Sequence, residues 1–133
     1  MAEPPSALNG RVLDPSAVAS WTEGRLAVQS WLGVAGRLGL TMIVPELAVE
    51  EIATLRPETD GVLWRLKRHP QVLLARMDAT RKAAIEAIHE HQPLANVTAA
   101  WVVTIARERG WTVLSADPRR LRVLDPHLPI DMV

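Results

Sequence analysis

Short apolar runs alternate with amphipathic stretches along most of the chain. Residues 11–14, 41–44, 72–75 and 112–115 are rich in valine, leucine and isoleucine and have the length of buried strands. The run at 72–75 is also compatible with the start of a helix. We interpret it as a strand because Pro70 precedes it and Asp78 follows as a helix start. Residues 130–133 are expected to form a last edge strand.

The stretches between these runs have helical spacing. A helix is expected to open at Pro15 or Ser16, where proline suits the first turn and serine the cap. Gly39 and Gly110 are plausible helix ends. The further helices are expected at residues 23–38, 46–55, 59–69, 79–89 and 94–109.

Strands that alternate with helices predict a three-layer α/β/α fold around a central, mostly parallel sheet. Residues 1–133 are expected to form one domain, with residues 1–9 as a flexible N-terminus. The order of the strands does not follow from this pattern.

Three acids lie at or just beyond the ends of predicted strands. Asp14 follows the first strand, Asp117 follows the fourth, and Glu51 lies in the helix after the second. The carboxyl ends of parallel strands meet at one edge of a sheet, where ligands bind. Carboxylates gathered there need a cation, and oxygen ligands suit Mg²⁺ or Mn²⁺. Such an ion can activate water and neutralise a phosphate.

Each acid also has an ordinary structural interpretation. Asp14 could cap the helix that follows it, Glu51 could be solvated, and Asp117 before Pro118 could be a turn residue. The edge that the three acids share favours the functional interpretation.

Composition and charge narrow the possible chemistry. The 133 residues include no cysteine, which excludes disulfide scaffolds and thiol nucleophiles, and no tyrosine. The formal net charge is zero, yet residues 52–82 carry seven basic and three acidic side chains. This basic segment is either a solvated helix face or a patch for RNA phosphates. Its candidate RNA-binding residues are Arg65, Lys67, Arg68, Arg81 and Lys82.

A cytoplasmic protein without membrane contact is expected. No apolar stretch is long enough to span a bilayer, and residues 1–10 lack the basic and apolar regions of a secretory signal.

Three segments together resemble the PIN-domain family, the nuclease fold of VapC-type toxins. They are VLDPSAVASW, IVPELAVEEIATL and IARERGWTVLSADP, and the resemblance extends over roughly residues 10–133. It implies that Asp14, Glu51 and Asp117 are catalytic acids and metal ligands. The family's remaining acid falls at Ala99, and Asn96, one turn earlier, is the nearest polar group that could ligate the metal.

The resemblance implies a ribonuclease that uses Mg²⁺ or Mn²⁺, acts on RNA, forms a homodimer and has an antitoxin partner. Ala99 motivates an alternative, a catalytically weak or inactive PIN-like module that binds a protein or RNA partner. A third interpretation is an unrelated α/β domain, such as a nucleotide-binding regulator, in which the three acids would lie far apart.

Overall fold

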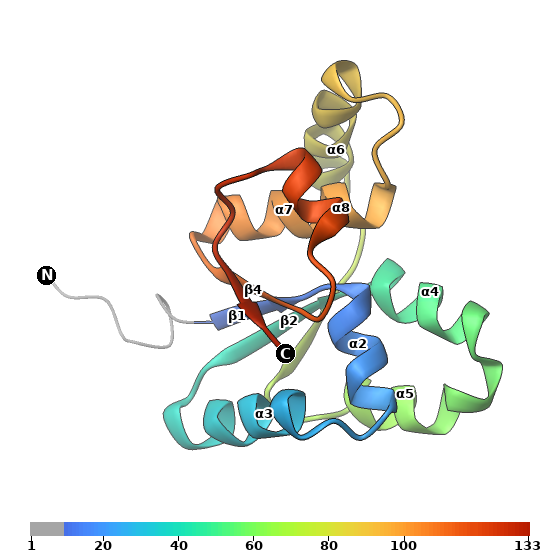
Figure 1. Cartoon of the computed structure of the whole chain (residues 1–133), viewed down its shortest axis with the longest axis vertical. Coiled ribbons are helices and arrows are strands. Elements are labelled where there is room, and N and C mark those ends of the chain that lie inside the picture. The colour runs from blue at the N-terminus through green and yellow to red at the C-terminus, as the bar shows by residue number, and fades with distance from the viewer. Residues whose placement is uncertain (1–9) are drawn as a thin grey trace, which may run out of the picture.

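The predicted strands form one sheet in which each neighbouring pair runs parallel (Figure 1). The structure is a computed structural model and describes residues 10–133, so the expectation for residues 1–9 lies outside the described part. The sheet has the order β3-β2-β1-β4-β5. Its strands are β1 (Gly10–Leu13), β2 (Thr41–Pro45), β3 (Val72–Ala75), β4 (Thr112–Ser115) and β5 (Ile130–Met132).

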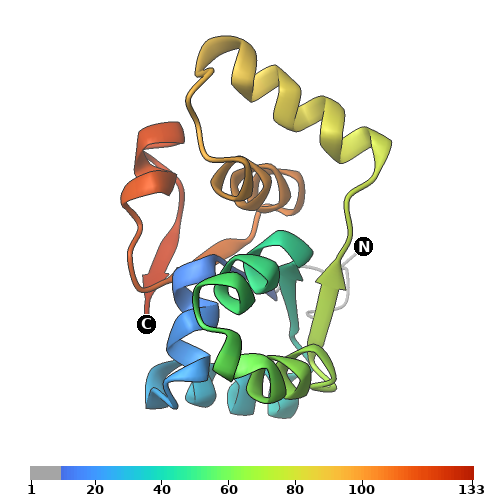
Figure 2. The same ribbon diagram turned by 90° about the vertical axis from the view of Figure 1, so that its right-hand side faces the viewer.

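Helices cover both faces of this sheet, which confirms the predicted α/β fold (Figures 1 and 2). One face carries α2 (Pro15–Thr22), α3 (Leu26–Leu38), α4 (Glu46–Leu55) and α5 (Asp60–Lys67). The other face carries α6 (Ala79–His91), α7 (Val97–Arg109) and α8 (Arg119–Leu124).

Each face has its own hydrophobic core. Successive strand residues point to opposite faces, and β1 follows this rule. Val12 packs into the core beneath α7, whereas Leu13 packs into the core beneath α2, α3 and α4. The strands therefore hold apolar residues on both sides, which explains why they read as continuous apolar runs.

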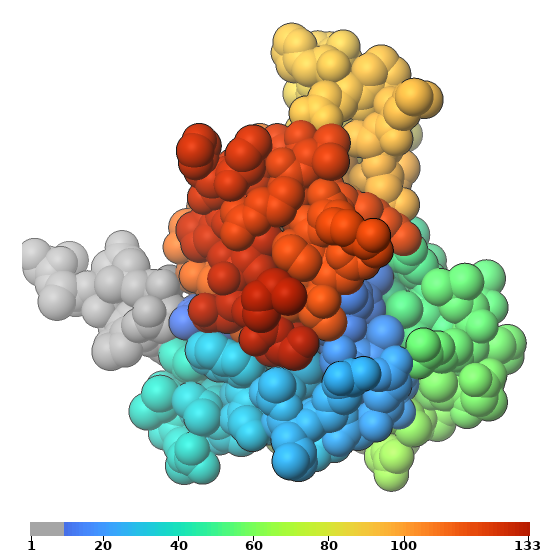
Figure 3. Space-filling view, in the orientation of Figure 1, coloured from blue at the N-terminus to red at the C-terminus, as the bar shows by residue number. Residues whose placement is uncertain are grey.

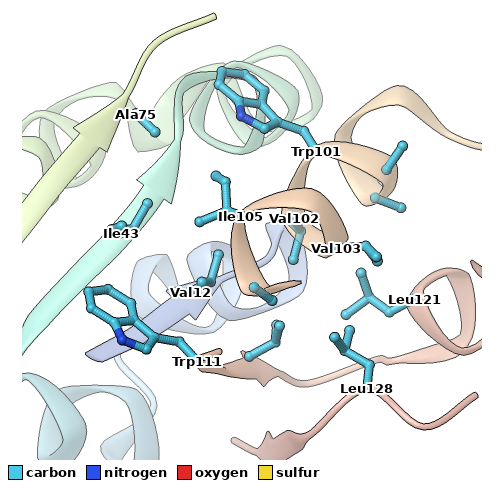
Figure 4. Packing of buried hydrophobic residues seen from close by; sticks show 14 of the residues in the cluster. Val12, Ile43, Ala75, Trp101, Val102, Val103, Ile105, Trp111, Leu121 and Leu128 are labelled. Carbon is cyan, nitrogen blue, oxygen red and sulfur yellow. The ribbon is translucent and has the colours of Figure 1, made fainter. Parts of the chain in front are cut away.

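Helix α7 forms the centre of one core. Every residue from Thr98 to Ala106 is buried, and Trp101 is fully enclosed. Figure 4 shows Trp101 and Ile105 packed with side chains of the neighbouring strands. The helix ends at Gly110, whose φ of 66° is the left-handed conformation that favours glycine.

Several helix boundaries differ from the sequence prediction. The helix expected at 23–38 begins only at Leu26, because Gly24 is left-handed and Arg25 extended. The helix expected at 94–109 begins at Val97, because the Asn96 side chain caps it. The short helix α8 and the 3₁₀ turn at Pro57–Thr59 were not predicted.

Candidate functional site

A pocket of about 160 Å³ lies at the carboxyl ends of the central strands. Four segments that are distant in sequence meet there: the start of α2, helix α4, the first turn of α7, and the β4–α8 connection. Figure 2 views the molecule from the side on which these elements meet. The pocket is lined by Asp14, Pro15, Ser16, Glu51, Ile52, Leu55, Ala99, Asp117, Arg120 and Leu121. The structure thus places all three predicted acids in one pocket. An unrelated α/β domain was expected to have them far apart.

Asp14 is the N-cap of α2 and is 3% exposed. Its Oδ1 accepts hydrogen bonds from the Ala17 backbone N–H at 2.8 Å and from the Ser16 hydroxyl at 2.7 Å. Its Oδ2 accepts one from the Ser115 hydroxyl at 2.6 Å. Burial raises the pKa of Asp14 above its ordinary value, although these hydrogen bonds act in the opposite direction. The capping role considered for this residue is therefore present in the structure.

Ser16 links the two chain segments that hold the acids. Its hydroxyl oxygen accepts the backbone N–H of Ala116 at 2.8 Å and that of Asp117 at 3.0 Å. It also lies 3.1 Å from the Ser115 hydroxyl. The expected helix-cap role belongs to Asp14 instead, and Ser16 fixes the β4–α8 connection against the start of α2.

Glu51 contributes one paired and one unpaired oxygen. Its Oε1 accepts a hydrogen bond from Arg120 Nη1 at 2.9 Å, which joins α4 to α8. Its Oε2 is buried and has no hydrogen-bond partner in the described part of the chain. A buried unpaired carboxylate oxygen is costly, so this atom points to a missing interaction at the pocket.

Asp117 is exposed and forms a two-pronged ion pair with Arg119. Arg119 Nε lies 2.8 Å from Oδ1, and Nη2 lies 2.7 Å from Oδ2. These charge-assisted hydrogen bonds lower the pKa of Asp117 to about 2. The carboxylate is therefore ionised at neutral pH, but both of its oxygens already face a guanidinium.

Of the two remaining predicted positions, Ala99 lies at the pocket and Asn96 lies away from it. Ala99 lines the pocket and is 4% exposed, so a methyl group occupies the place where the family resemblance implies an acid. Asn96 is exposed and is not among the lining residues. Its side-chain oxygen accepts the Ala99 backbone N–H at 2.9 Å as the cap of α7. The structure assigns Asn96 a capping role and does not bring it to the three acids.

The donor set does not fit a divalent metal ion as the side chains stand. Within residues 10–133, no three histidine or acidic side chains are grouped closely enough to hold one. Asp14 has hydrogen bonds to both oxygens, and arginines pair with Glu51 and Asp117. The unpaired Glu51 Oε2 is the one feature that favours a cation. The predicted three-ligand centre is therefore not formed.

The basic candidates do not form one patch. Arg65 and Lys67 are exposed on α5, and the exposed Arg68 at its C-cap lies over Trp64, 4.6 Å from the ring centroid. Arg81 and Lys82 are on α6, at the opposite end of the molecule (Figures 1 and 3). Strand β3 separates the two groups because it carries the chain from one end of the sheet to the other. The single phosphate patch predicted from the charge run is thus divided.

Sequence reasoning missed Ser115, Arg119 and Arg120 as site residues. The two arginines follow Asp117-Pro118 directly, so their proximity to Asp117 could have been noticed. The contact of Arg120 with Glu51 spans 69 residues and requires knowledge of the sheet order.

Ser16→Ala is expected to lower the free energy of unfolding by about 1–2 kcal/mol, because the backbone N–H of Ala116 loses its acceptor and that of Asp117 keeps only the Ser115 hydroxyl. Urea unfolding followed by circular dichroism measures this. Thr59→Ala, which removes an exposed hydroxyl bonded only to the Arg56 carbonyl, is the control. A loss in Ser16→Ala no larger than in Thr59→Ala would contradict the linking role.

Within residues 10–133, no helix combines the length and apolar character needed to cross a membrane.

Comparison with known proteins supports the fold. No protein-family model matches the chain, and no curated protein matches it. A solved structure does: the crystal structure of VapBC2 from Rickettsia felis bound to a DNA fragment from their promoter. The TM-score is 0.72 at 8% identity, over 92% of this chain and 98% of that chain. The likeness covers nearly the whole of both chains and shows that this chain has the PIN-like α/β fold.

Proposed function

We propose that this chain is a toxin-type PIN module of a toxin–antitoxin pair, with weak or no ribonuclease activity, that binds an antitoxin-like protein partner. We infer the weak activity from the side chains in and beside the pocket. A methyl group stands at Ala99, and arginines pair with Glu51 and Asp117. Hydrolysis of a phosphodiester by this class of site depends on a cation held by free carboxylates.

The partner is proposed from the structural neighbour. That neighbour is a VapBC2 complex, in which two proteins of such a pair are bound to promoter DNA. The likeness in fold extends over 92% of this chain, which supports the proposal of a similar partner. A homodimer is proposed as well, on the family resemblance alone, and a cytoplasmic setting is proposed with it.

A second function is favoured by a specific observation. Three acids line one pocket, and the buried Glu51 Oε2 lacks a partner in the described chain. A ribonuclease dependent on Mg²⁺ or Mn²⁺ would use both features. In this alternative, basic side chains would contact the RNA backbone and make binding salt-dependent. They are Arg65 and Lys67 on α5, Arg68 at its C-cap, and Arg81 and Lys82 on α6.

Cleavage of an end-labelled single-stranded RNA separates the two functions. Wild-type protein and Asp117→Asn are incubated with Mn²⁺ or with Mg²⁺, and the products are resolved on a gel. Asp117 is exposed, so its replacement leaves the core intact. We expect little or no cleavage by either protein. Efficient cleavage by the wild type that Asp117→Asn abolishes would contradict the proposal and establish the ribonuclease.

The partner is tested by co-expression with any small DNA-binding protein whose gene neighbours that of this chain. Size-exclusion chromatography with light scattering measures the mass of the product and that of the chain alone. A stable complex of the two proteins is expected. Elution of the chain alone, with the second protein folded but separate, would contradict the partner assignment. The mass of the chain alone decides between monomer and homodimer.

A further inference from the structure

Two arginines of α8 supply the positive charge that a metal ion would otherwise bring to the acids of this pocket. We propose that Arg119 and Arg120 are the counterions of the pocket acids Asp117 and Glu51, and that Arg120, which itself lines the pocket, is a latch that keeps divalent cations away from Glu51. This inference deepens the proposed function, because it gives a physical reason for weak activity. It concerns the cation and not the partner or the RNA.

The Arg120 contact joins two elements that are independent in sequence. Glu51 lies on α4 and Arg120 on α8, and Nη1 meets Oε1 at 2.9 Å. Both residues line the pocket, so the guanidinium stands in the space where a cation would approach Glu51. The Glu51 side chain is 23% exposed, against 57% for Arg120. The acid is held in the wall while the arginine reaches it from the solvent side, which is the arrangement of a removable latch.

The Arg119 contact neutralises the other accessible acid. Its guanidinium forms two parallel hydrogen bonds with Asp117, the strongest geometry for this kind of pair. Arginine stays protonated at any pH that the folded protein tolerates. Both Asp117 oxygens are therefore opposed by a permanent positive charge, and a divalent cation must displace it.

The third acid offers no alternative ligand. Asp14 is buried, and the hydroxyls of Ser16 and Ser115 donate to its two oxygens. The fourth position holds Ala99, which supplies no charge. The two arginines cancel most of the negative charge of the three carboxylates, and Ala99 adds none. The acids therefore keep little net charge with which to attract a divalent cation, so the arginines and Ala99 act in the same direction.

Cation binding is measured directly, with Mn²⁺ alone as the probe. Calorimetry gives the affinity, and electron paramagnetic resonance counts free Mn²⁺. Wild-type protein is expected to bind with a dissociation constant on the order of millimolar or weaker. The double variant Arg119→Gln, Arg120→Gln is expected to bind about tenfold more tightly or better, because each tenfold corresponds to about 1.4 kcal/mol. Arg120→Lys retains the positive charge and is expected to stay near the wild type.

The same arginine substitutions are also made in the Ala99→Asp variant, so that a missing fourth carboxylate cannot explain an unchanged Mn²⁺ affinity. Ala99→Asp alone restores the fourth carboxylate, and we expect the two arginine substitutions to increase its Mn²⁺ affinity by about tenfold again. Arg122→Gln is the matched control on the same helix. Its guanidinium bonds the Pro126 and Leu128 carbonyls and does not line the pocket, so it should change Mn²⁺ binding little. Circular dichroism verifies that each variant is folded.

Three results would overturn the inference, and the first two concern affinity for Mn²⁺ directly. One is micromolar Mn²⁺ binding by the wild type. The other is an unchanged affinity when both arginines are replaced, in the natural background and in Ala99→Asp. An equal gain in Arg122→Gln would assign the effect to general charge and would also overturn the latch. Because none of these measurements uses RNA or a protein partner, failure here is distinguishable from failure of the proposed function.

Discussion

Trp101→Ala is expected to lower the free energy of unfolding by about 4 kcal/mol, the usual scale for removing an enclosed aromatic side chain. Trp101 is fully buried in α7 and is the largest of the completely enclosed side chains. Its ring packs in the core that α7 shares with β1, β2 and β4 (Figure 4).

Trp101→Phe keeps the test informative if the alanine variant does not fold. The Trp101 indole N–H is buried and has no hydrogen-bond partner among the described residues. Phenylalanine removes that costly group while retaining most of the apolar volume, so the loss should be about 1 kcal/mol. Urea unfolding followed by circular dichroism measures both variants.

Trp64→Ala is the matched control for Trp101. Trp64 is 54% exposed and contacts Arg68 through its ring face, so its loss should cost about 1 kcal/mol or less. A larger effect at Trp64 than at Trp101 would contradict the assignment of α7 as the centre of the core.

The fold was largely predictable because its sheet is buried on both faces. Strands of this kind appear as apolar runs, and runs such as Thr41–Pro45 can be read without knowing their neighbours. Helix starts were less predictable, since side-chain caps decide them. Asn96 begins α7 three residues later than periodicity indicated, because its amide oxygen binds the Ala99 N–H.

The pocket was predictable only in part. The parallel rule brought Asp14, Glu51 and Asp117 to one place, and the structure has them there. The rule does not predict which basic side chains form ion pairs with these acids. The Arg120–Glu51 pair depends on the placement of α8 against α4, and α8 has only six residues and carries little periodic signal. The charge run at 52–82 failed as a single patch because β3 divides it.

Asp14→Ala is expected to lower the free energy of unfolding by about 3 kcal/mol. The cap of α2 is lost, which costs about 1 kcal/mol. The buried Ser115 hydroxyl also loses its acceptor, which adds about 1–2 kcal/mol. Asp14→Asn retains a capping oxygen and offers an N–H to Ser115, so it should cost about 1 kcal/mol or less. Equal losses in the two variants would show that the hydrogen bonds of Asp14 do not stabilise the fold.

The pH dependence of Asp14→Asn gives a test that a general packing defect would not imitate. Burial raises the pKa of Asp14 above 3.8, so the folded protein binds this proton more tightly than the unfolded chain. Its stabilising contribution is complete below pH 3.8 and is lost as the pH rises through the raised pKa. Relative to Asp14→Asn, the wild type should therefore lose stability as the pH rises above 3.8 and through the raised pKa.

Asp117→Asn should show the opposite dependence in a lower window. Arg119 holds the pKa of Asp117 at about 2, so its contribution is present above pH 3.8 and is lost as the pH falls toward 2. Urea unfolding of wild type, Asp14→Asn and Asp117→Asn across this range resolves the two windows. Parallel profiles for all three proteins would contradict both assignments. Separate profiles would show that one pocket holds an acid disfavoured by burial beside an acid stabilised by an arginine.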